Sequence, residues 1–224
     1  MDAFPEFKLY ADQLAEIARW AYRNGWAPGT STNYSMRLPI EARPALCAIT
    51  SSRVDKDTIN SDHILAVDHQ GRPVGGESLT PSTETALHLM LYRTTEAGAI
   101  LHTHSLAAAL LSQTAHQHGQ LTISGWELLK GLEGVTSHQC EVTLPVFPNS
   151  QDMRRLAAEI EPRLVAAPVC HGFLLAGHGL YVWGKDIRAA KRHLEVLEFL
   201  LQCEREVRNY GNPKSTRQAS MSHE

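Results

Sequence analysis

The chain has 224 residues, of which 43% are hydrophobic, enough for one large domain with a substantial core. Its formal net charge is −3 at pH 7, so composition does not favour a broad basic surface for nucleic acid or for an anionic membrane. The chain starts without the basic and apolar regions of a signal peptide and has no apolar run of roughly 18 residues, which predicts a soluble, cytoplasmic protein without a membrane partner.

The first half of the chain predicts one helix followed by three short strands. Apolar residues at helical spacing predict a helix over residues 6–24, which Gly25 ends. Short apolar and β-branched runs then predict strands at residues 33–38, 46–50 and 64–67. Turn-forming residues 68–71 would close a hairpin, so this part of the sheet is predicted to be antiparallel.

The second half alternates helices and strands. Proline near its start predicts a helix over residues 80–95, with Glu84 in the first turn, near the positive end of the helix dipole. Further helices are expected at residues 105–115, 150–165 and 186–208. The strands between them are predicted to end at His104, to cover residues 141–146, and to form a pair within residues 172–183.

The order of these elements predicts one α/β domain over residues 1–211. Strands and helices are interleaved, but several connections are as short as hairpins, which favours a mixed or antiparallel sheet with helices on both faces. A doubly wound parallel sheet is less compatible with these connections. Residues 212–224 are polar, lack periodicity and are expected to be a disordered tail.

Two histidines one residue apart stand at the end of a predicted strand. Because side chains alternate across a strand, His102 and His104 leave on the same face, which suits two bonds to one divalent ion. A third candidate ligand is His178, whose flanking glycines leave room for another backbone or a ligand. Three imidazoles would leave coordination positions open for substrate. The alternative interpretation is that these histidines are hydrogen-bonded core or turn residues.

Three loops rich in glycine and hydroxyl residues could together bind an anion. They cover residues 28–33, 50–53 and 80–84, each at the boundary of a predicted element, where backbone N–H groups are free. Taken singly, such loops are ordinary turns and helix caps. The nearby cations Arg53 and Lys56 could add positive charge to this anion site.

Two glutamates are candidates for acid/base chemistry. Glu84 lies near the start of its predicted helix, and Glu127 lies in the sequence Trp-Glu-Leu-Leu-Lys-Gly at residues 126–131. A nearby metal lowers the pKa of a carboxyl group and desolvation raises it, so either glutamate could be adapted to proton transfer. The alternatives are a contact with the helix dipole for Glu84 and a solvent-facing position for Glu127.

At these residues the chain resembles the class II aldolase/adducin-like family of metal-dependent sugar-phosphate enzymes. The resemblance covers residues 9–210, and its motifs occur in the family order. They are Gly29-Thr30 with Asn33, Ser51-Ser52, Pro81-Ser82-Thr83-Glu84, His102-Thr103-His104 and Gly177-His178-Gly179. Two further segments, residues 126–131 and 178–184, resemble the dehydratases of this family, and the first of them corresponds to the segment that bears their acid/base glutamate.

The resemblance implies a three-layer α/β/α sandwich with a central mixed, mainly antiparallel sheet. It also implies one Zn2+ per subunit, held by the three histidines, and a homotetramer with its sites near subunit contacts. The implied substrate is a phosphorylated ketose and the implied reaction is dehydration, with Glu127 and Glu84 as catalytic residues. The implied phosphate-binding residues are Gly29, Thr30, Asn33, Ser51, Ser52, Arg53 and Ser82.

Two features of the chain depart from the family pattern. Arg53 follows Ser52 where these enzymes often have glycine, so a side-chain cation could replace close backbone approach to the phosphate. Glu84 matches the acid/base residue of the aldolases, whereas Glu127 matches that of the dehydratases. Aldol cleavage or epimerisation of another phosphorylated ketose, and a non-catalytic interaction protein on the same scaffold, are therefore the alternatives.

A purely structural zinc site fits the sequence less well. Closed structural sites usually use four protein ligands with cysteine among them. The four cysteines, Cys47, Cys140, Cys170 and Cys203, lie about thirty or more residues apart and form no C-x-x-C pair, so they are expected to be reduced thiols. The histidine set therefore favours an open, catalytic metal site.

Overall fold

A single nine-stranded sheet runs through the computed structural model, which describes residues 4–75, 78–166 and 171–211. The strand order is β4-β3-β2-β1-β5-β9-β8-β7-β6, and every neighbouring pair is antiparallel except β7 with β8. The strands are β1 (Asn33–Arg37), β2 (Ala45–Thr50), β3 (Ile64–Asp68), β4 (Pro73–Val74), β5 (Ala99–Thr103), β6 (Gln120–Ile123), β7 (Val142–Phe147), β8 (Gly172–Leu175) and β9 (Gly179–Gly184).

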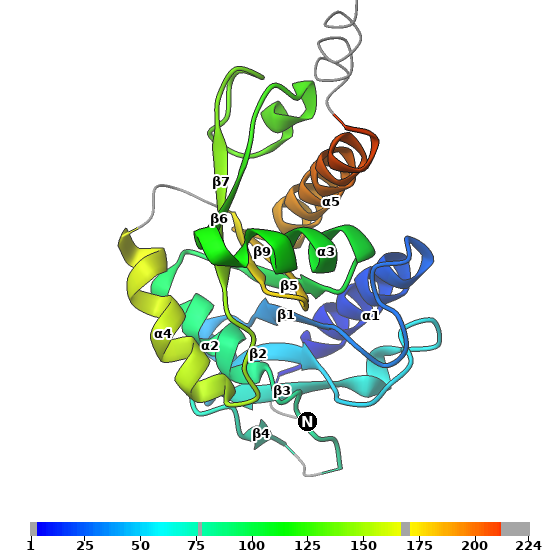
Figure 1. The fold of residues 1–224 in the computed structure, drawn as a ribbon. Helices are drawn as coiled ribbons and strands as arrows, with labels where there is room; N and C mark the ends of the chain where they lie inside the picture. The colour runs from blue at the N-terminus through cyan, green and yellow to red at the C-terminus, as the bar shows by residue number, and fades with distance from the viewer. Residues whose placement is uncertain (1–3, 76–77, 167–170, 212–224) are drawn as a thin grey trace, which may run out of the picture.

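Helices cover both faces of this sheet, which makes three layers (Figure 1). On one face α1, α3 and α5 share a core with the strands, and on the other face α2 and α4 lie side by side. The mixed, mainly antiparallel α/β/α sandwich expected from the sequence is therefore confirmed. The helices are α1 (Phe7–Arg23), α2 (Thr85–Thr94), α3 (Leu106–Ala115), α4 (Met153–Ala166) and α5 (Ile187–Tyr210).

The start of α2 differs from the sequence-based prediction. Residues 80–84 are not helical, because Pro81 forms an isolated β-bridge with Ser51 and the Ser82 hydroxyl accepts a hydrogen bond from the Glu84 N–H. The helix therefore begins at Thr85, with Glu84 as its N-terminal cap residue. This correction places the Glu84 side chain in a turn against the sheet instead of on the first helical turn.

A strand at the sheet edge was not predicted. β6 has only four residues, and its side chains alternate between exposed and buried, as on an edge strand with one face on the core. It pairs with β7 and leads into the short 3-10 helix η4 (Glu127–Gly131). The predicted tail, residues 212–224, lies outside the described residues.

The centre of the sheet positions the histidine motif. All five residues of β5 and all six of β9 are buried, because helices cover both faces of these central strands. Gly179 is required at the start of β9, since a Cβ atom there would lie 2.0 Å from the Thr103 carbonyl oxygen. This glycine allows the turn that carries His178 to lie against the end of β5.

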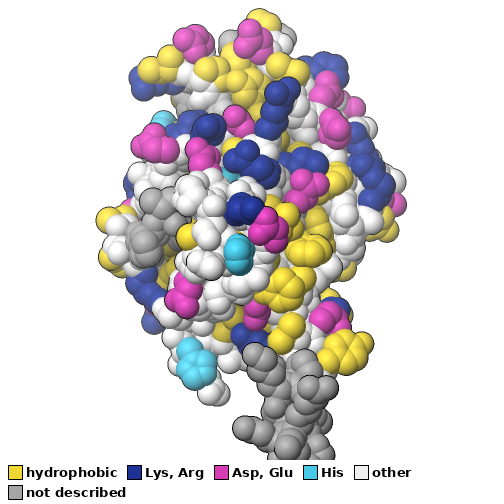
Figure 2. Space-filling view, turned by 90° about the horizontal axis from the view of Figure 1, so that it is seen from above, with side chains coloured by type: hydrophobic (Ala, Val, Ile, Leu, Met, Phe, Trp, Pro, Cys, Tyr) yellow, Lys and Arg dark blue, Asp and Glu magenta, His cyan; other side chains and the backbone are white. Residues whose placement is uncertain are grey.

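The surface agrees with the near-neutral composition. Figure 2 shows one face of the molecule, on which Lys and Arg side chains are interspersed with Asp and Glu side chains. No broad basic patch covers this face. Among the described residues, no helix combines the length and the apolar character needed to span a bilayer.

Candidate metal centre and active site

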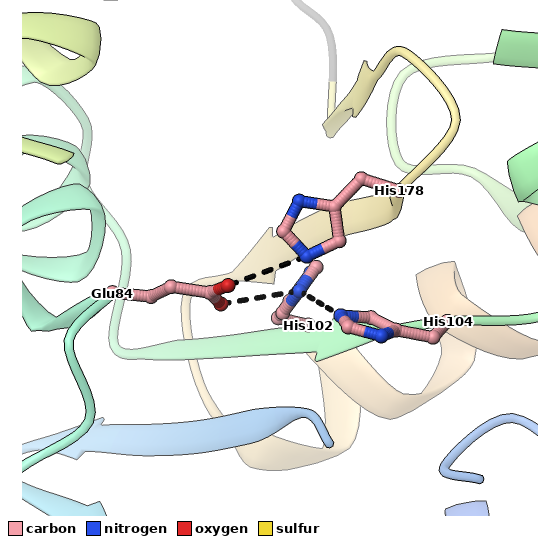
Figure 3. A group of neighbouring side chains, drawn as sticks. All are labelled: Glu84, His102, His104 and His178. Atoms are coloured by element: carbon pink, nitrogen blue, oxygen red, sulfur yellow. Dashed lines mark hydrogen bonds and ion pairs between the residues drawn. The ribbon is translucent and has the colours of Figure 1, made fainter. Parts of the chain in front are cut away.

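Three histidines and one glutamate from distant parts of the chain meet at the end of β5 (Figure 3). His102 is on β5, and His104 directly follows this strand. His178 lies in the turn between β8 and β9, and Glu84 directly precedes α2. Each residue offers one ligand atom, and these four atoms lie within 4.8 Å of one another. The three histidines predicted from sequence are thus brought to a common point.

Hydrogen bonds fix the orientation of two of the imidazole rings. His102 Nδ1 lies 3.0 Å from the Leu180 carbonyl oxygen, and His178 Nδ1 lies 3.2 Å from Asn149 Oδ1. Because both acceptors are oxygens, each Nδ1 carries the proton, and each Nε2 keeps a free lone pair. Metal-binding histidines are commonly oriented in this way.

The opposed ring nitrogens fit a bound cation. His102 Nε2 and His104 Nε2 are 2.7 Å apart, and two lone pairs at this distance repel unless a proton or a cation lies between them. Burial lowers the pKa of His102 well below its usual value and lowers that of His104 to about 4. Both rings are therefore neutral at pH 7, which is the form that binds a metal.

Glu84 is the carboxylate of this cluster. Its Oε2 accepts hydrogen bonds from Asn33 Nδ2 and the Tyr181 hydroxyl, each at 2.7 Å, and lies 3.2 Å from His102 Nε2. Its Oε1 lies 3.3 Å from His178 Nε2. Burial by itself would raise the pKa of Glu84, but positive charge at His102 and His178 and the hydrogen bond from Asn33 lower it below the usual range, so the side chain is ionised when the cluster holds positive charge.

A chain of buried hydrogen bonds holds Asn33 behind Glu84. Asn33 Oδ1 lies 2.5 Å from His88 Nε2, His88 Nδ1 lies 2.6 Å from Ser35 Oγ, and Ser35 Oγ lies 2.8 Å from the Tyr92 hydroxyl. Because the Asn33 amide nitrogen donates to Glu84, its oxygen must accept the His88 Nε2 proton. His88 Nδ1 then accepts from Ser35, so the donors along this chain are directed towards the carboxylate.

Tyr181 and Asn149 are contacts that the sequence reasoning missed. Tyr181 is directly opposite His102 in the register of β9 and β5, and the two rings stack with centroids 3.9 Å apart. Tyr181 could have been predicted from the pairing of β9 with β5, because cross-strand neighbours on the same face of a sheet contact each other and His102 lies on that face. Asn149 is an isolated loop residue, and no motif marked it.

The predicted anion-binding loops meet beside Glu84. Asn33 Nδ2 lies 3.2 Å from Ser82 Oγ, Ser51 pairs with Pro81, and the Ser52 N–H donates to the Thr80 carbonyl oxygen. Ser51 is 4% exposed, and its hydroxyl has no hydrogen-bond partner among the described residues. A buried hydroxyl without a partner is costly, which fits a position that binds a ligand.

The outer members of the predicted phosphate site are exposed. Gly29, Thr30 and Arg53 lie in turns that border the inner loops, and both Gly29 and Arg53 have φ of 62°. A left-handed backbone favours glycine, which agrees with the expectation that glycine is common at the position of Arg53 in the family pattern. Arginine in this conformation costs about 1 kcal/mol or more.

Glu127 lies outside the histidine cluster. It is the first residue of η4, its side chain is 71% exposed, it forms an ion pair with Lys130, and its Oε2 lies 3.6 Å from His138 Nδ1. The neighbouring Trp126 Nε1 donates to Glu204 on α5 over 2.8 Å, which attaches this segment to the helix. The structure therefore brings one of the two predicted acid/base residues to the histidines and leaves the other at the surface.

Comparisons with known proteins identify the relatives of this chain. The family model described as "Class II Aldolase and Adducin N-terminal domain" matches residues 12–204. A methylthioribulose-1-phosphate dehydratase from Sorangium cellulosum is 45% identical over 202 residues, which are 90% of this chain and 93% of the relative. The enzyme of the same name from Xanthomonas campestris pv. campestris is 44% identical over 212 residues, covering 91% and 95%.

Solved structures with lower sequence identity share the fold. An L-fuculose-1-phosphate aldolase from Thermus thermophilus has a TM-score of 0.69 at 23% identity, over 90% of this chain and 96% of the other. An aldolase II superfamily protein from Pseudomonas syringae has a TM-score of 0.74 at 22% identity, over 95% and 81%. These likenesses concern the fold alone.

Proposed function

The chain belongs to the family of class II aldolase and adducin N-terminal domains, and from this premise we propose that it is a lyase that dehydrates 5-methylthioribulose 1-phosphate. The product is 5-methylthio-2,3-dioxopentyl phosphate, and the reaction is a step of methionine salvage. The observation that carries the proposal is the near full-length identity of 45% and 44% to relatives named for this dehydration.

The proposal assigns one Zn2+ to the histidine cluster. His102, His104 and His178 would be its ligands, because each ring directs a nitrogen towards the common point. A divalent ion bound there would act as a Lewis acid that polarises the ketose carbonyl. Three imidazole ligands leave room for substrate oxygens, as this role requires.

Glu84 is the first candidate for proton transfer. In the dehydration the C3 proton is removed, its electron pair stays on the carbon skeleton, and the C4 hydroxyl leaves with a proton as water. The ionised Glu84 carboxylate is able to take the C3 proton at Oε1, because Asn33 and Tyr181 both donate to Oε2. These two donors keep the carboxylate turned towards the histidines.

Glu127 is the second candidate, with the role of returning a proton to the departing C4 hydroxyl. Because its carboxylate lies at the surface, this role requires either a movement of the η4 segment or a contact between subunits. The proposal therefore includes a homotetramer with its sites near subunit contacts, in the cytoplasm, as the resemblance implies.

The substrate phosphate is assigned to the loops beside Glu84. Serine hydroxyls, one asparagine amide and free backbone N–H groups are donors suited to phosphate oxygens. The inner residues of this site are Asn33, Ser51, Ser52 and Ser82, and the bordering residues are Gly29, Thr30 and Arg53.

Aldol cleavage is the second candidate function, and the position of Glu84 favours it. This glutamate matches the acid/base residue of the aldolases and lies directly beside the histidines. The two reactions differ in their products, because cleavage gives two carbonyl fragments whereas dehydration keeps the carbon skeleton.

Product analysis tests the proposal. The zinc-loaded protein is incubated with methylthioribulose 1-phosphate, fuculose 1-phosphate or ribulose phosphates, and the products are separated by mass. We expect turnover of methylthioribulose 1-phosphate to a single product lighter by one water molecule. Two fragments from any of these ketoses would show that the protein is an aldolase and not a dehydratase. A zinc-loaded protein without turnover would favour a non-catalytic interaction protein.

A further inference from the structure

Lys56 is a buried cation without a carboxylate partner. The residue is 1% exposed, and its Nζ donates hydrogen bonds to the carbonyl oxygens of Val54 at 2.8 Å and Thr30 at 3.3 Å. No Asp or Glu among the described residues is within ion-pair distance of it. A buried charge is expensive unless it is paired, so this ammonium group needs an explanation.

The ammonium group contacts the loop that also holds the end of β5. The backbone N–H of His104 donates to the Trp26 carbonyl oxygen, which ties the end of β5 to the loop that contains Thr30. Lys56 therefore stands where the loops of residues 28–32 and 51–56 meet, and the first of these loops holds the end of β5, which carries the proposed metal ligands.

A second observation, on the same loop of residues 51–56, also points to a ligand. The hydroxyl of Ser51, on the loop that leads to Lys56, is buried and without a partner among the described residues. Lys56 lacks a carboxylate partner, and the Ser51 hydroxyl lacks a hydrogen-bond acceptor. One anion bound between these loops would supply both. Burial lowers the pKa of Lys56 to about 8, so the group still carries its charge at neutral pH.

A purely structural role for Lys56 explains less. Two backbone carbonyl oxygens can be satisfied by a neutral donor, which would avoid the cost of burying a charge. An anion that reaches this ammonium group would offset the cost of burying its charge. An organic phosphate carries about two negative charges at neutral pH and accepts several hydrogen bonds, so it matches both Lys56 and Ser51.

We propose that Lys56 is the ionic partner of the substrate's phosphate group and makes the site specific for phosphorylated over free ketoses. This inference rests on the proposed function for the identity of the substrate, but not for the presence of an anion site. Lys56 is then a specificity-determining residue of the same site. The uncharged donors of the phosphate loops orient the group, and Lys56 supplies the charge.

The test compares Lys56→Met and Lys56→Arg with the exposed control Lys8→Met, whose lysine pairs only with surface groups. The first measurement is the shift in thermal unfolding temperature of the zinc-loaded proteins on titration with inorganic phosphate. We expect phosphate to stabilise the native protein and the control, to act at about tenfold or higher concentration on Lys56→Arg, and to have no effect on Lys56→Met.

Kinetics give the second measurement. In Lys56→Met we expect KM for methylthioribulose 1-phosphate to rise about tenfold or more with a smaller change in kcat, and the preference over unphosphorylated methylthioribulose to fall by a similar factor. If Lys56→Met does not fold, Lys56→Arg with raised KM and weakened phosphate stabilisation supports the same conclusion. Phosphate stabilisation equal to that of the native protein in the folded variants would overturn the inference.

The failure of this inference is distinguishable from failure of the proposed function. If the native protein turns over no methylthioribulose 1-phosphate but phosphate stabilises it and not Lys56→Met, the anion site stands and the dehydratase proposal falls. If the native protein turns over methylthioribulose 1-phosphate and all variants respond equally to phosphate, the dehydratase proposal stands and the anion site at Lys56 falls.

Discussion

The two candidate acid/base glutamates lie in opposite surroundings. The Glu84 side chain is 13% exposed and contacts two histidines, one asparagine and one tyrosine. The Glu127 side chain is 71% exposed and pairs with surface groups. The contrast teaches that a family motif identifies a residue, whereas the tertiary structure decides what that residue contacts in the isolated subunit.

The physical difference between the two regions is desolvation. Around Glu84, water is excluded and each donor is held by a further buried group, so the interactions are strong and directional. Around Glu127, solvent and salt screen the electrostatic contacts, which therefore contribute little to stability. Mutations in the first region should therefore affect metal, turnover and stability together, and mutations in the second should affect turnover alone.

The largest effect is expected from removal of a histidine ligand. His178→Ala should lose bound zinc and lower turnover by about a thousandfold or more, because the substrate carbonyl is then no longer polarised. Metal content and kcat are measured on the same preparation. The control is His118→Ala, which removes an exposed histidine of the 3-10 helix after α3. Full zinc retention in His178→Ala would mean that the third ligand is another residue.

A smaller effect is expected at Glu84. Glu84→Gln keeps the shape of the side chain but cannot accept a proton, so kcat should fall by about a few hundredfold. Zinc content should fall less than in His178→Ala, since the three imidazole ligands remain. An unchanged kcat would remove Glu84 from proton transfer and leave it as a neighbour of the metal.

Glu127→Gln sharpens the comparison directly. We expect kcat to fall by about a hundredfold, while zinc content and unfolding temperature stay unchanged because the side chain is exposed. The same assay applied to Glu195→Gln, an exposed glutamate that pairs with Lys191 on α5, provides the matched control. Native turnover in Glu127→Gln would assign the proton transfer to Glu84 alone.

The smallest effects are expected along the hydrogen-bond chain behind Glu84. His88→Phe removes the hydrogen-bond partner of the buried Asn33 Oδ1 and one of the two partners of Ser35 Oγ, which should cost about 1–3 kcal/mol of unfolding free energy and lower kcat about tenfold. Tyr92→Phe, at the far end of the chain, should lower kcat less than about twofold. Denaturant unfolding and steady-state kinetics measure both, and an equal loss of kcat in the two variants would contradict a role that acts through Asn33.

Most of the fold was predictable because local periodicity encodes it. The helices at α1, α3 and α5 and the strands that carry the histidines follow spacings of about 3.6 and 2 residues. Two errors came from contacts that are distant in sequence. Pro81 pairs with Ser51 and delays the start of α2, and pairing with β7 makes a strand of four residues whose own pattern is too short to indicate one.

The sequence by itself determined that His102 and His104 share a face and that glycines make room for His178. Only the tertiary structure decided that Glu84 joins these histidines, that Tyr181 stacks on His102 and that Lys56 is buried. The reason is that spacing along the chain fixes the direction of a side chain within one element. Strand register and packing between elements then determine which side chains meet and which of them lose their water.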